Sequence, residues 1–190
     1  EQPGMLRAAI GDLCASCHDL GTPEMKAKHS GADVAALNCV GCHAPHASEG
    51  PGLIAGKKHP PFESGDCEVC HGEGTPTKLA SAQNEACGTC HPDEAAPAQP
   101  GETVHVPVAE GECSTCHNPH ASDRDHFLQA AEADLCRECH DDKHPNGAVQ
   151  HAPFADGNCT KCHNPHRSMN AGLLRDTTLN TCFSCHSGLK

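Results

Sequence analysis

Apolar residues are few along this chain, and they gather in short stretches with helical spacing. The clearest stretches are residues 5–18, 32–43 and 125–140. In the last of them Phe127, Leu128, Ala131 and Leu135 recur every three to four residues, as on one face of an amphipathic helix. No stretch shows the alternation typical of a strand, and 15 Pro and 18 Gly indicate turns and coil in between. The pattern predicts a mainly coil fold with short α-helices and essentially no β-sheet.

The composition does not support a conventional apolar core. Leu, Ile, Val and Phe make up about 13% of the 190 residues, and the net charge is −12. Chains with less than roughly 20% of these residues and a high net charge are expected to be disordered, because they bury too little apolar surface to offset their ordering entropy. The residues in surplus are 16 Cys and 17 His. Something that those residues hold must fill the interior.

Every cysteine belongs to a C-x-x-C pair, and a histidine follows each pair directly. The eight motifs, numbered in chain order, are Cys14, Cys17 and His18; Cys39, Cys42 and His43; Cys67, Cys70 and His71; Cys87, Cys90 and His91; Cys113, Cys116 and His117; Cys136, Cys139 and His140; Cys159, Cys162 and His163; and Cys182, Cys185 and His186. C-x-x-C-H is the attachment motif of c-type haem. Two thiols about one helical turn apart form thioethers with the haem vinyl groups, and the histidine is the proximal iron ligand. The sequence therefore predicts eight haem c groups, numbered like their motifs.

Three other chemistries use paired cysteines. Disulfides favour even cysteine numbers, zinc ribbons use paired C-x-x-C, and thioredoxin-like sites use one such pair. None of them requires a histidine after the second cysteine, whereas all eight pairs have one. Eight haems leave about 24 residues for each, so the porphyrins themselves are expected to form the core.

The chain contains an internal repeat with a period of 46 residues. His59, His105 and His151 are spaced by 46, and the same holds for Cys67, Cys113 and Cys159. Each unit begins with H-x-P, continues to a first C-x-x-C-H, often followed by N-P-H, and ends with a second motif. Residues 92–104 resemble a linker that could separate residues 1–91, with haems 1–4, from residues 105–190, with haems 5–8. Because the repeat continues across it, we expect one octahaem domain over residues 1–190.

Nine histidines remain for the distal side of the irons. Seven occupy repeated positions, either 8–10 residues before a motif or at the end of CH-x-PH: His29, His59, His105, His151, His46, His120 and His166. A histidine three residues after a proximal one cannot reach the opposite face of the same porphyrin. The CH-x-PH histidines are therefore expected to ligate a neighbouring haem.

Eight distal positions need one ligand more. The repeat that begins at His59 lacks the P-H after His71, so we expect the vacancy at haem 3 or haem 4, with His126, or alternatively His144, as the eighth ligand. Methionine is the rival ligand in cytochromes c. Met5, Met25 and Met169 stand at no repeated position, which favours histidine throughout.

Bis-histidine ligation closes both faces of each iron and leaves no place for a substrate. The predicted chemistry is outer-sphere electron transfer along a chain of haems with low, spread potentials, and not catalysis. A multihaem reductase is the enzymatic alternative. It requires an open haem and catalytic side chains, whereas all eight motifs end in His and Tyr is absent.

The units HVPVAEGECSTCHNPHAS…LCRECH and HAPFADGNCTKCHNPHRS…TCFSCH resemble the doubled-CXXCH family of multihaem c-type cytochromes. The resemblance is close over residues 105–190, fair over 29–91 and poor before residue 29. It implies low-spin bis-histidine haems, alternating stacked and perpendicular haem pairs, and extracellular or respiratory electron transfer. The family includes periplasmic cytochromes that sit in outer-membrane porins, and some relatives form extracellular filaments. We therefore expect extracellular or outer-surface respiratory electron transfer in the form of a polymerised nanowire, with a monomeric periplasmic or porin-embedded shuttle as the alternative.

Haem c is attached after export, so an extracellular, cell-surface or otherwise periplasmic location is expected. Since the chain starts at Glu1 without a basic and then apolar leader, it is interpreted as a mature form. No stretch approaches the roughly 20 apolar residues needed to span a bilayer. The acidic balance argues against nucleic acid. Redox proteins or extracellular acceptors, and further copies of the chain, are the expected partners.

Overall fold

The computed structural model describes residues 6–54, 56–72, 78–140 and 149–189, and divides the chain into two compact units. The first unit comprises residues 1–81 and 118–127, and the second comprises residues 82–117 and 128–190. Residues 92–104 lie inside the second unit, where they include a helix and a strand. The single octahaem domain stays a prediction.

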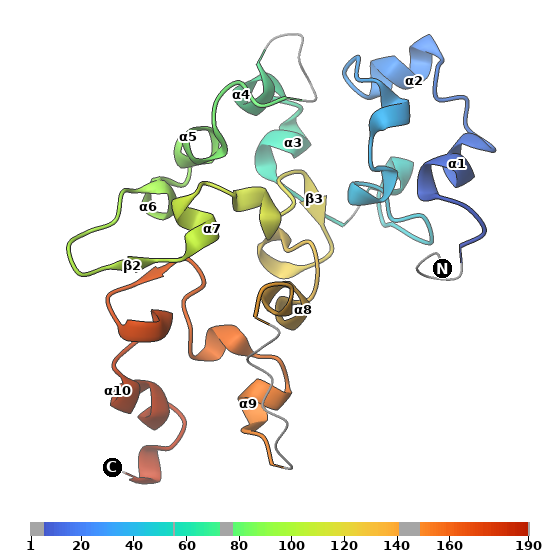
Figure 1. Ribbon diagram of the computed structural model, residues 1–190. Coiled ribbons are helices and arrows are strands. Elements are labelled where there is room, and N and C mark those ends of the chain that lie inside the picture. Colours follow the sequence, from blue (N-terminus) through green and yellow to red (C-terminus); the bar gives the residue numbers. More distant parts are fainter. Residues whose placement is uncertain (1–5, 55, 73–77, 141–148, 190) are drawn as a thin grey trace. The chain divides into compact units, whose positions relative to one another are not determined.

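Short helices joined by loops make up both units (Figure 1). The α-helices are α1 (Ile10–Ala15), α2 (Pro23–Lys28), α3 (Pro60–Ser64), α4 (Glu68–His71), α5 (Gln83–Gly88), α6 (Pro92–Ala95), α7 (Val106–Ala109), α8 (Glu132–Arg137), α9 (Ala152–Ala155) and α10 (Thr178–Phe183). The 3₁₀ turns are η2 (Val34–Ala36), η3 (Cys39–Gly41), η4 (Pro51–Leu53), η5 (Cys113–Thr115), η6 (Asp125–Phe127), η8 (Cys159–Lys161), η9 (Ala171–Leu173) and η10 (Ser187–Leu189). The strands are β1 (Lys57–Lys58), β2 (Thr103–Val104), β3 (Ala121–Ser122) and β4 (Arg167–Ser168). The predicted fold class is confirmed.

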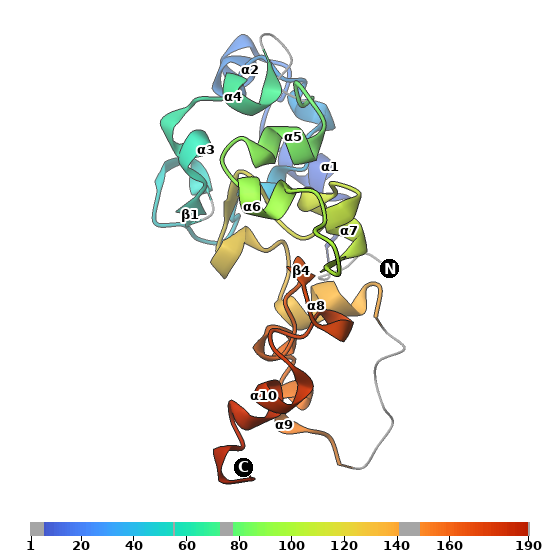
Figure 2. The ribbon, with the colours of Figure 1, turned by 90° about the vertical axis from the view of Figure 1, so that its left-hand side faces the viewer.

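The helices are shorter than the apolar spacing predicted. Residues 5–18 contain α1, residues 32–43 contain only the turns η2 and η3, and residues 125–140 contain η6 and α8. Helices of this length are marginal unless packing supports them. Figure 2 shows α8, α9 and α10 of the second unit as separate short helices.

Two antiparallel strand pairs, each two residues long, tie consecutive repeats together. In the first unit β1 pairs with β3, with Lys57 opposite Ser122. In the second unit β2 pairs with β4, with Thr103 opposite Ser168. Both partners in the second pair lie 46 residues after those in the first, so the pairing follows the repeat. A strand of two residues is too short to show an alternation of apolar and polar positions, so the sequence pattern did not predict these strands.

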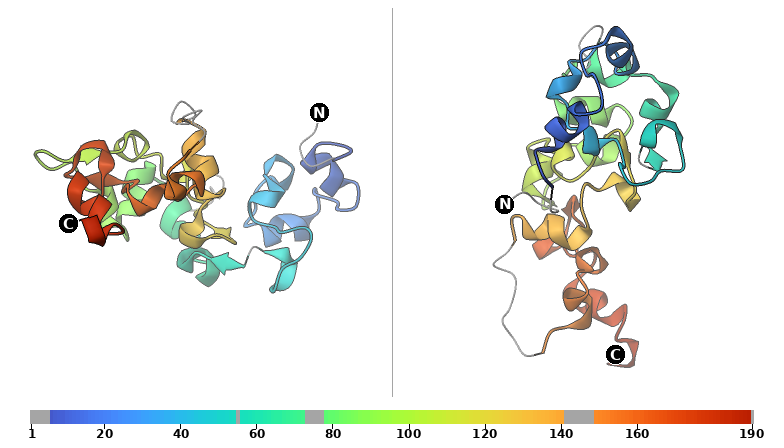
Figure 3. Two further views of the ribbon diagram at one scale, coloured as in Figure 1. Left: turned by 90° about the horizontal axis from the view of Figure 1, so that it is seen from below. Right: turned by 90° about the vertical axis from the view of Figure 1, so that its right-hand side faces the viewer.

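Hardly any side chain in the described part of the chain is buried. The buried apolar residues there are Ala32, Val34 and Ala121, and none of the described large side chains is fully enclosed. The chain exposes 13407 Å², whereas a compact protein of 19.8 kDa exposes roughly 8,600 Å². Even two separate bodies of half that mass would expose roughly 10,400 Å². Figure 3 shows the short helices and connecting segments of the two units from two further sides. The described polypeptide alone therefore forms no apolar core, and another group must supply one.

Candidate haem-binding sites

Each C-x-x-C-H motif forms one turn of helix. In all eight, the histidine N–H donates to the carbonyl of the first cysteine at 2.9–3.1 Å, as in His18 to Cys14 and His117 to Cys113. Residues three and four apart on a helical turn lie on the same side. The turn therefore presents both thiols and the imidazole to one side, as attachment to a single porphyrin requires. None of the 16 cysteines is paired in a disulfide.

The backbone fixes the tautomer of several motif histidines. Nδ1 of His43 lies 2.6 Å from the carbonyl of Gly52, Nδ1 of His163 lies 2.7 Å from that of Gly172, and Nδ1 of His71 lies 3.0 Å from that of Lys78. A carbonyl only accepts, so each Nδ1 carries the proton and Nε2 keeps its lone pair. Histidine ligands of metals characteristically donate their other N–H in this way.

The carbonyls that accept from His43 and His163 come from turns in which two successive residues have positive φ. Gly52 and Leu53 form one such turn, and Gly172 and Leu173 form another. Glycine at the first position adopts this backbone without strain. The equivalent residue nine positions after His117 is His126, at φ 55°. A non-glycine residue there costs about 1–3 kcal/mol, and such strain clusters at functional sites.

Among the described residues, five ring pairs place a motif histidine opposite a second histidine. The pairs, with their ring-centroid separations, are His43 with His29 at 6.1 Å, His71 with His120 at 5.7 Å, His117 with His166 at 5.9 Å, His140 with His105 at 6.0 Å and His186 with His151 at 6.0 Å. Two metal–imidazole bonds of about 2.0 Å separate their nitrogens by about 4 Å. Nε2 of His71 lies 3.5 Å from Nε2 of His120, so this pair is close to that spacing. The residues fit a metal held between paired imidazoles.

The CH-x-PH histidines of the last two repeats face a motif one repeat earlier. His120 follows motif 5 and faces His71 of motif 3, and His166 follows motif 7 and faces His117 of motif 5. The preceding asparagine orients each of them, since Oδ1 of Asn118 accepts from the N–H of His120 and Oδ1 of Asn164 from that of His166, both at 3.0 Å. These histidines therefore link neighbouring repeats, and their ligation of a neighbouring haem stays a prediction.

The H-x-P histidines have a different role. His105 faces His140 and His151 faces His186, in each case the second motif of their own repeat. His59, His105 and His151 each precede a short helix with proline in its first turn, a position that suits proline because no N–H is needed there. The N–H of His59 donates to the carbonyl of His120, and that of His105 to the carbonyl of His166. The strand pairs thus place two distal-type histidines side by side.

The missing P-H after His71 does not leave that motif without a facing ring. We expected a vacancy at haem 3 or 4, but the structure places His120 opposite His71. A P-H histidine after His71 would serve a motif before it, and there His43 already faces His29. Within the described residues, the rings of His18, His46 and His163 contact no other histidine ring. His144 lies outside the described residues.

Successive motifs also contact one another through a pair of side-chain hydrogen bonds that recurs in the next repeat. The Gln83 side chain bonds the backbone N–H and hydroxyl of Ser114 at 2.8 and 2.9 Å. One repeat later, the Glu132 carboxylate accepts from the N–H and hydroxyl of Thr160 at 2.7 and 2.9 Å. Each contact joins the second motif of a repeat to the first motif of the next. We call these two paired hydrogen bonds clamps. The sequence pattern does not predict them, although Gln83 and Glu132 each stand four residues before a motif.

Burial governs the ionisation of several site residues. It lowers the pKa of His120, with neighbouring His71 adding to the effect, and lowers the pKa of His166, with His117 adding to it. A lowered pKa favours the neutral imidazole, which is the form that ligates metals. Burial and neighbouring Cys159 raise the pKa of Cys136 to about 12, so motifs 6 and 7 approach each other closely.

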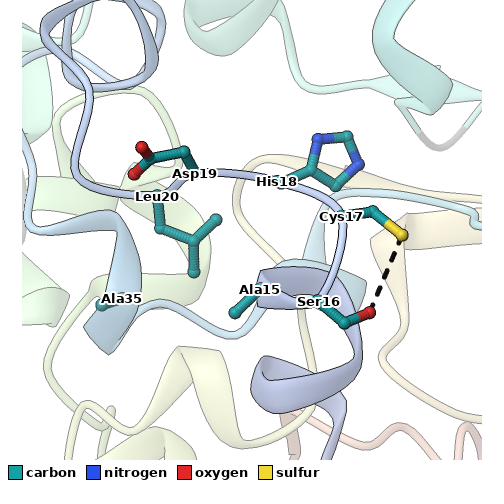
Figure 4. Close-up of a pocket in the computed structure, with 7 residues that line it drawn as sticks. All are labelled: Ala15, Ser16, Cys17, His18, Asp19, Leu20 and Ala35. Carbon is teal, nitrogen blue, oxygen red and sulfur yellow. Dashed lines mark hydrogen bonds between the residues drawn. The ribbon is translucent and has the colours of Figure 1, made fainter.

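The first motif borders an open hollow of about 540 Å³ (Figure 4). Residues 15–20 and Ala35 line it, and the His18 imidazole stands at its edge beside Cys17.

The described residues contain no cluster of three or more His, Cys, Asp or Glu suited to a bare metal ion. No helix of the described part of the chain is long and apolar enough to cross a membrane.

Each C-x-x-C-H turn presents the groups that attach one haem, several motif imidazoles are oriented by backbone carbonyls, and several face a second histidine. Together these features define a multihaem c-type cytochrome. The doubled CXXCH motif family matches residues 59–96, 105–145 and 151–190, more than half of the chain, and the chain belongs to it. Residues 19–72 also match the family of cytochrome c554 and c-prime. No curated protein matches the chain. The three matches begin at His59, His105 and His151, which confirms the 46-residue repeat.

Proposed function

We propose that this protein transfers electrons along eight covalently bound bis-histidine haem c groups. Membership of a multihaem cytochrome family supports electron transfer in general. Bound haem iron would supply the ferric–ferrous couple, and the polypeptide would hold each porphyrin by two thioethers and two imidazoles. The observation that carries the proposal is the set of five facing histidine pairs among the described residues, because a second imidazole on an iron leaves no site for a substrate.

The contacts between successive motifs support a relay within each unit. In the first unit, the thiols of Cys14 and Cys39 interact, and Oγ of Ser30, beside His29, lies 3.9 Å from Sγ of Cys67. In the second unit, the clamps on Ser114 and Thr160 join motif 4 to motif 5 and motif 6 to motif 7. Haems on contiguous motifs would be close enough for electrons to pass between them.

We assign the distal ligands from the sequence repeat and the facing rings. They are His29, His46, His59, His105, His120, His151 and His166, with His126 or His144 as the eighth. The ring of His163 contacts no other histidine ring within the described residues, so we assign the eighth ligand to haem 7. His126 is supported by its strained position in η6, where the equivalent turns carry glycine.

Spectroscopy of the purified holoprotein tests the function. We expect a mass increase of eight haems, an electron paramagnetic resonance spectrum with low-spin ferric haem only, and no CO binding after reduction. A film on an electrode should reduce and reoxidise all eight haems without any substrate. A stoichiometric high-spin signal, CO binding, or a catalytic current with nitrite, hydroxylamine or tetrathionate would instead identify a reductase.

The same CO measurement locates the eighth ligand. Of the variants His126→Ala and His144→Ala, one is expected to bind one CO per chain, and the other none. Adding Cys159→Ser and Cys162→Ser, which prevents attachment of haem 7, should abolish that binding. If CO binding persists in the triple variant, the eighth ligand serves another haem.

We further propose that the protein acts outside the cell or at its surface, as a polymer of many copies. c-type cytochromes are generally exported, and because the chain has so few apolar residues, contacts between copies would add to its stability. Electron microscopy of the holoprotein should show filaments with a regular repeat. Uniform monomers at every concentration would favour the periplasmic or porin-embedded shuttle instead.

A further inference from the structure

In motifs 5 and 7 the residue after the first cysteine is held by side chains from two directions. That residue is Ser114 in motif 5 and Thr160 in motif 7. Besides the clamp on its N–H and hydroxyl, the carbonyl of Ser114 accepts from the side chain of Gln129, and the carbonyl of Thr160 accepts from Nε of Arg175. Gln129 and Arg175 stand 46 residues apart, so the arrangement follows the repeat, with two charged side chains at motif 7 and two neutral ones at motif 5.

The clamp at motif 7 fixes this motif against the helix that carries motif 6. The Glu132 carboxylate at the start of α8 accepts from the N–H and the hydroxyl of Thr160 at 2.7 and 2.9 Å. Both residues are half-buried, and a hydrogen bond to a charged group is roughly twice as strong as a neutral one. With Arg175 on its carbonyl, Thr160 has its N–H, hydroxyl and carbonyl all bonded.

The clamp stands directly beside a contact between two haem-attaching sulfurs. The thiols of Cys136 and Cys159 share a hydrogen bond. Cys136 stands one helical turn after Glu132, and Cys159 directly precedes the clamped threonine. The same contact between first cysteines occurs in the other unit, between Cys14 and Cys39 of motifs 1 and 2. All four cysteines are only half-buried, so each thiol keeps an open side for haem attachment.

We propose that Glu132 is a positioning residue for electron transfer between haems 6 and 7. By clamping Thr160 it keeps the first cysteines of motifs 6 and 7 in contact, so that the thioether edges of the two porphyrins meet. One electron then passes from the ferrous to the ferric iron of this pair, with no proton transfer and no change in bonding. This inference rests on the proposed attachment of eight haems and adds the side chain that sets the spacing of one pair.

Circular dichroism in the Soret band of the holoprotein tests the proposal, because two porphyrins held close together give paired bands of opposite sign. Glu132→Ala should lose the part of this signal that arises from haem 7, while the haem mass and the low-spin iron stay unchanged. Glu132→Gln should retain the signal, since Gln83 makes the same two bonds to Ser114. Asp134→Asn removes the same charge from an exposed position of α8 and should also retain it.

A variant without haem 7 shows which pair responds. When Cys159→Ser and Cys162→Ser are present, adding Glu132→Ala should cause no further change. A change that persists there, an unchanged signal in Glu132→Ala alone, or an equal loss in Asp134→Asn would overturn the proposal. If Glu132→Ala does not incorporate its haems, Thr160→Ala, which removes only the hydroxyl bond, must weaken the paired bands, and an unchanged signal overturns the proposal. Failure of the proposed function would instead appear as missing haem or high-spin iron in the unaltered protein.

Discussion

Without its haems the chain is expected to be unfolded. Ordering a residue costs about 1–2 kcal/mol of backbone entropy, and the buried apolar side chains of the described residues are only Ala32, Val34 and Ala121. Large apolar side chains beside the motifs, such as Val106 and Leu179, are more than 60% exposed. The porphyrin faces would cover these side chains, and the thioethers would restrict the unfolded chain in the way that disulfides do.

Circular dichroism measures this directly. The chain produced in a reducing compartment, where haem is not attached, should show a coil-like spectrum and no cooperative thermal transition. The holoprotein, measured under the same conditions, should melt cooperatively. A haem-free chain with a native-like spectrum and a sharp melting transition would show that the polypeptide folds by itself, which contradicts a haem-based core.

The covalent chemistry could be predicted from residue identity alone. Haem c attachment depends on two thiols and a histidine within five consecutive residues, so motifs such as Cys113, Cys116 and His117 need no tertiary information. Residue spacing alone also predicts that a CH-x-PH histidine ligates a haem other than that of its own motif. A ligand three residues from a proximal histidine cannot reach the far face of the same haem. Both predictions follow from local geometry.

The identity of the facing partners could not be predicted in the same way. His120 faces His71, 49 residues earlier, and its neighbourhood depends on the pairing of β1 with β3. Strands of two residues carry no alternating pattern, and their register follows only from the folded chain. For that reason the missing P-H after His71 indicated a vacancy at haem 3 or 4, although His120 reaches motif 3 from the next repeat.

The apolar pattern of the sequence also did not predict the lengths of the helices. The apolar spacing over residues 125–140 extends through η6 and α8 without marking the tight turn of η6, in which His126 and Phe127 both have positive φ.

His120→Ala is expected to convert haem 3 from a six-coordinate, low-spin site to an open one. His120 faces His71 with the two Nε2 atoms 3.5 Å apart, and burial lowers the pKa of His120, which favours the neutral ligand. The variant should therefore show one high-spin haem in eight and bind one CO per chain after reduction, while the unaltered protein binds none. His120→Met should stay low-spin with a more positive potential for one haem, because a thioether replaces an imidazole.

Phe62→Ala is the matched control for this site. The Phe62 ring lies 5.3 Å from that of His120 and packs against it without an atom that could ligate iron. Its removal should loosen the surroundings of His120 and leave every haem low-spin. If Phe62→Ala and His120→Ala gave the same high-spin signal, His120 would be a packing residue, and an unchanged spectrum in His120→Ala would mean that another residue ligates haem 3. The predicted contrast between the two variants arises only when the His120 imidazole is itself bonded to the iron.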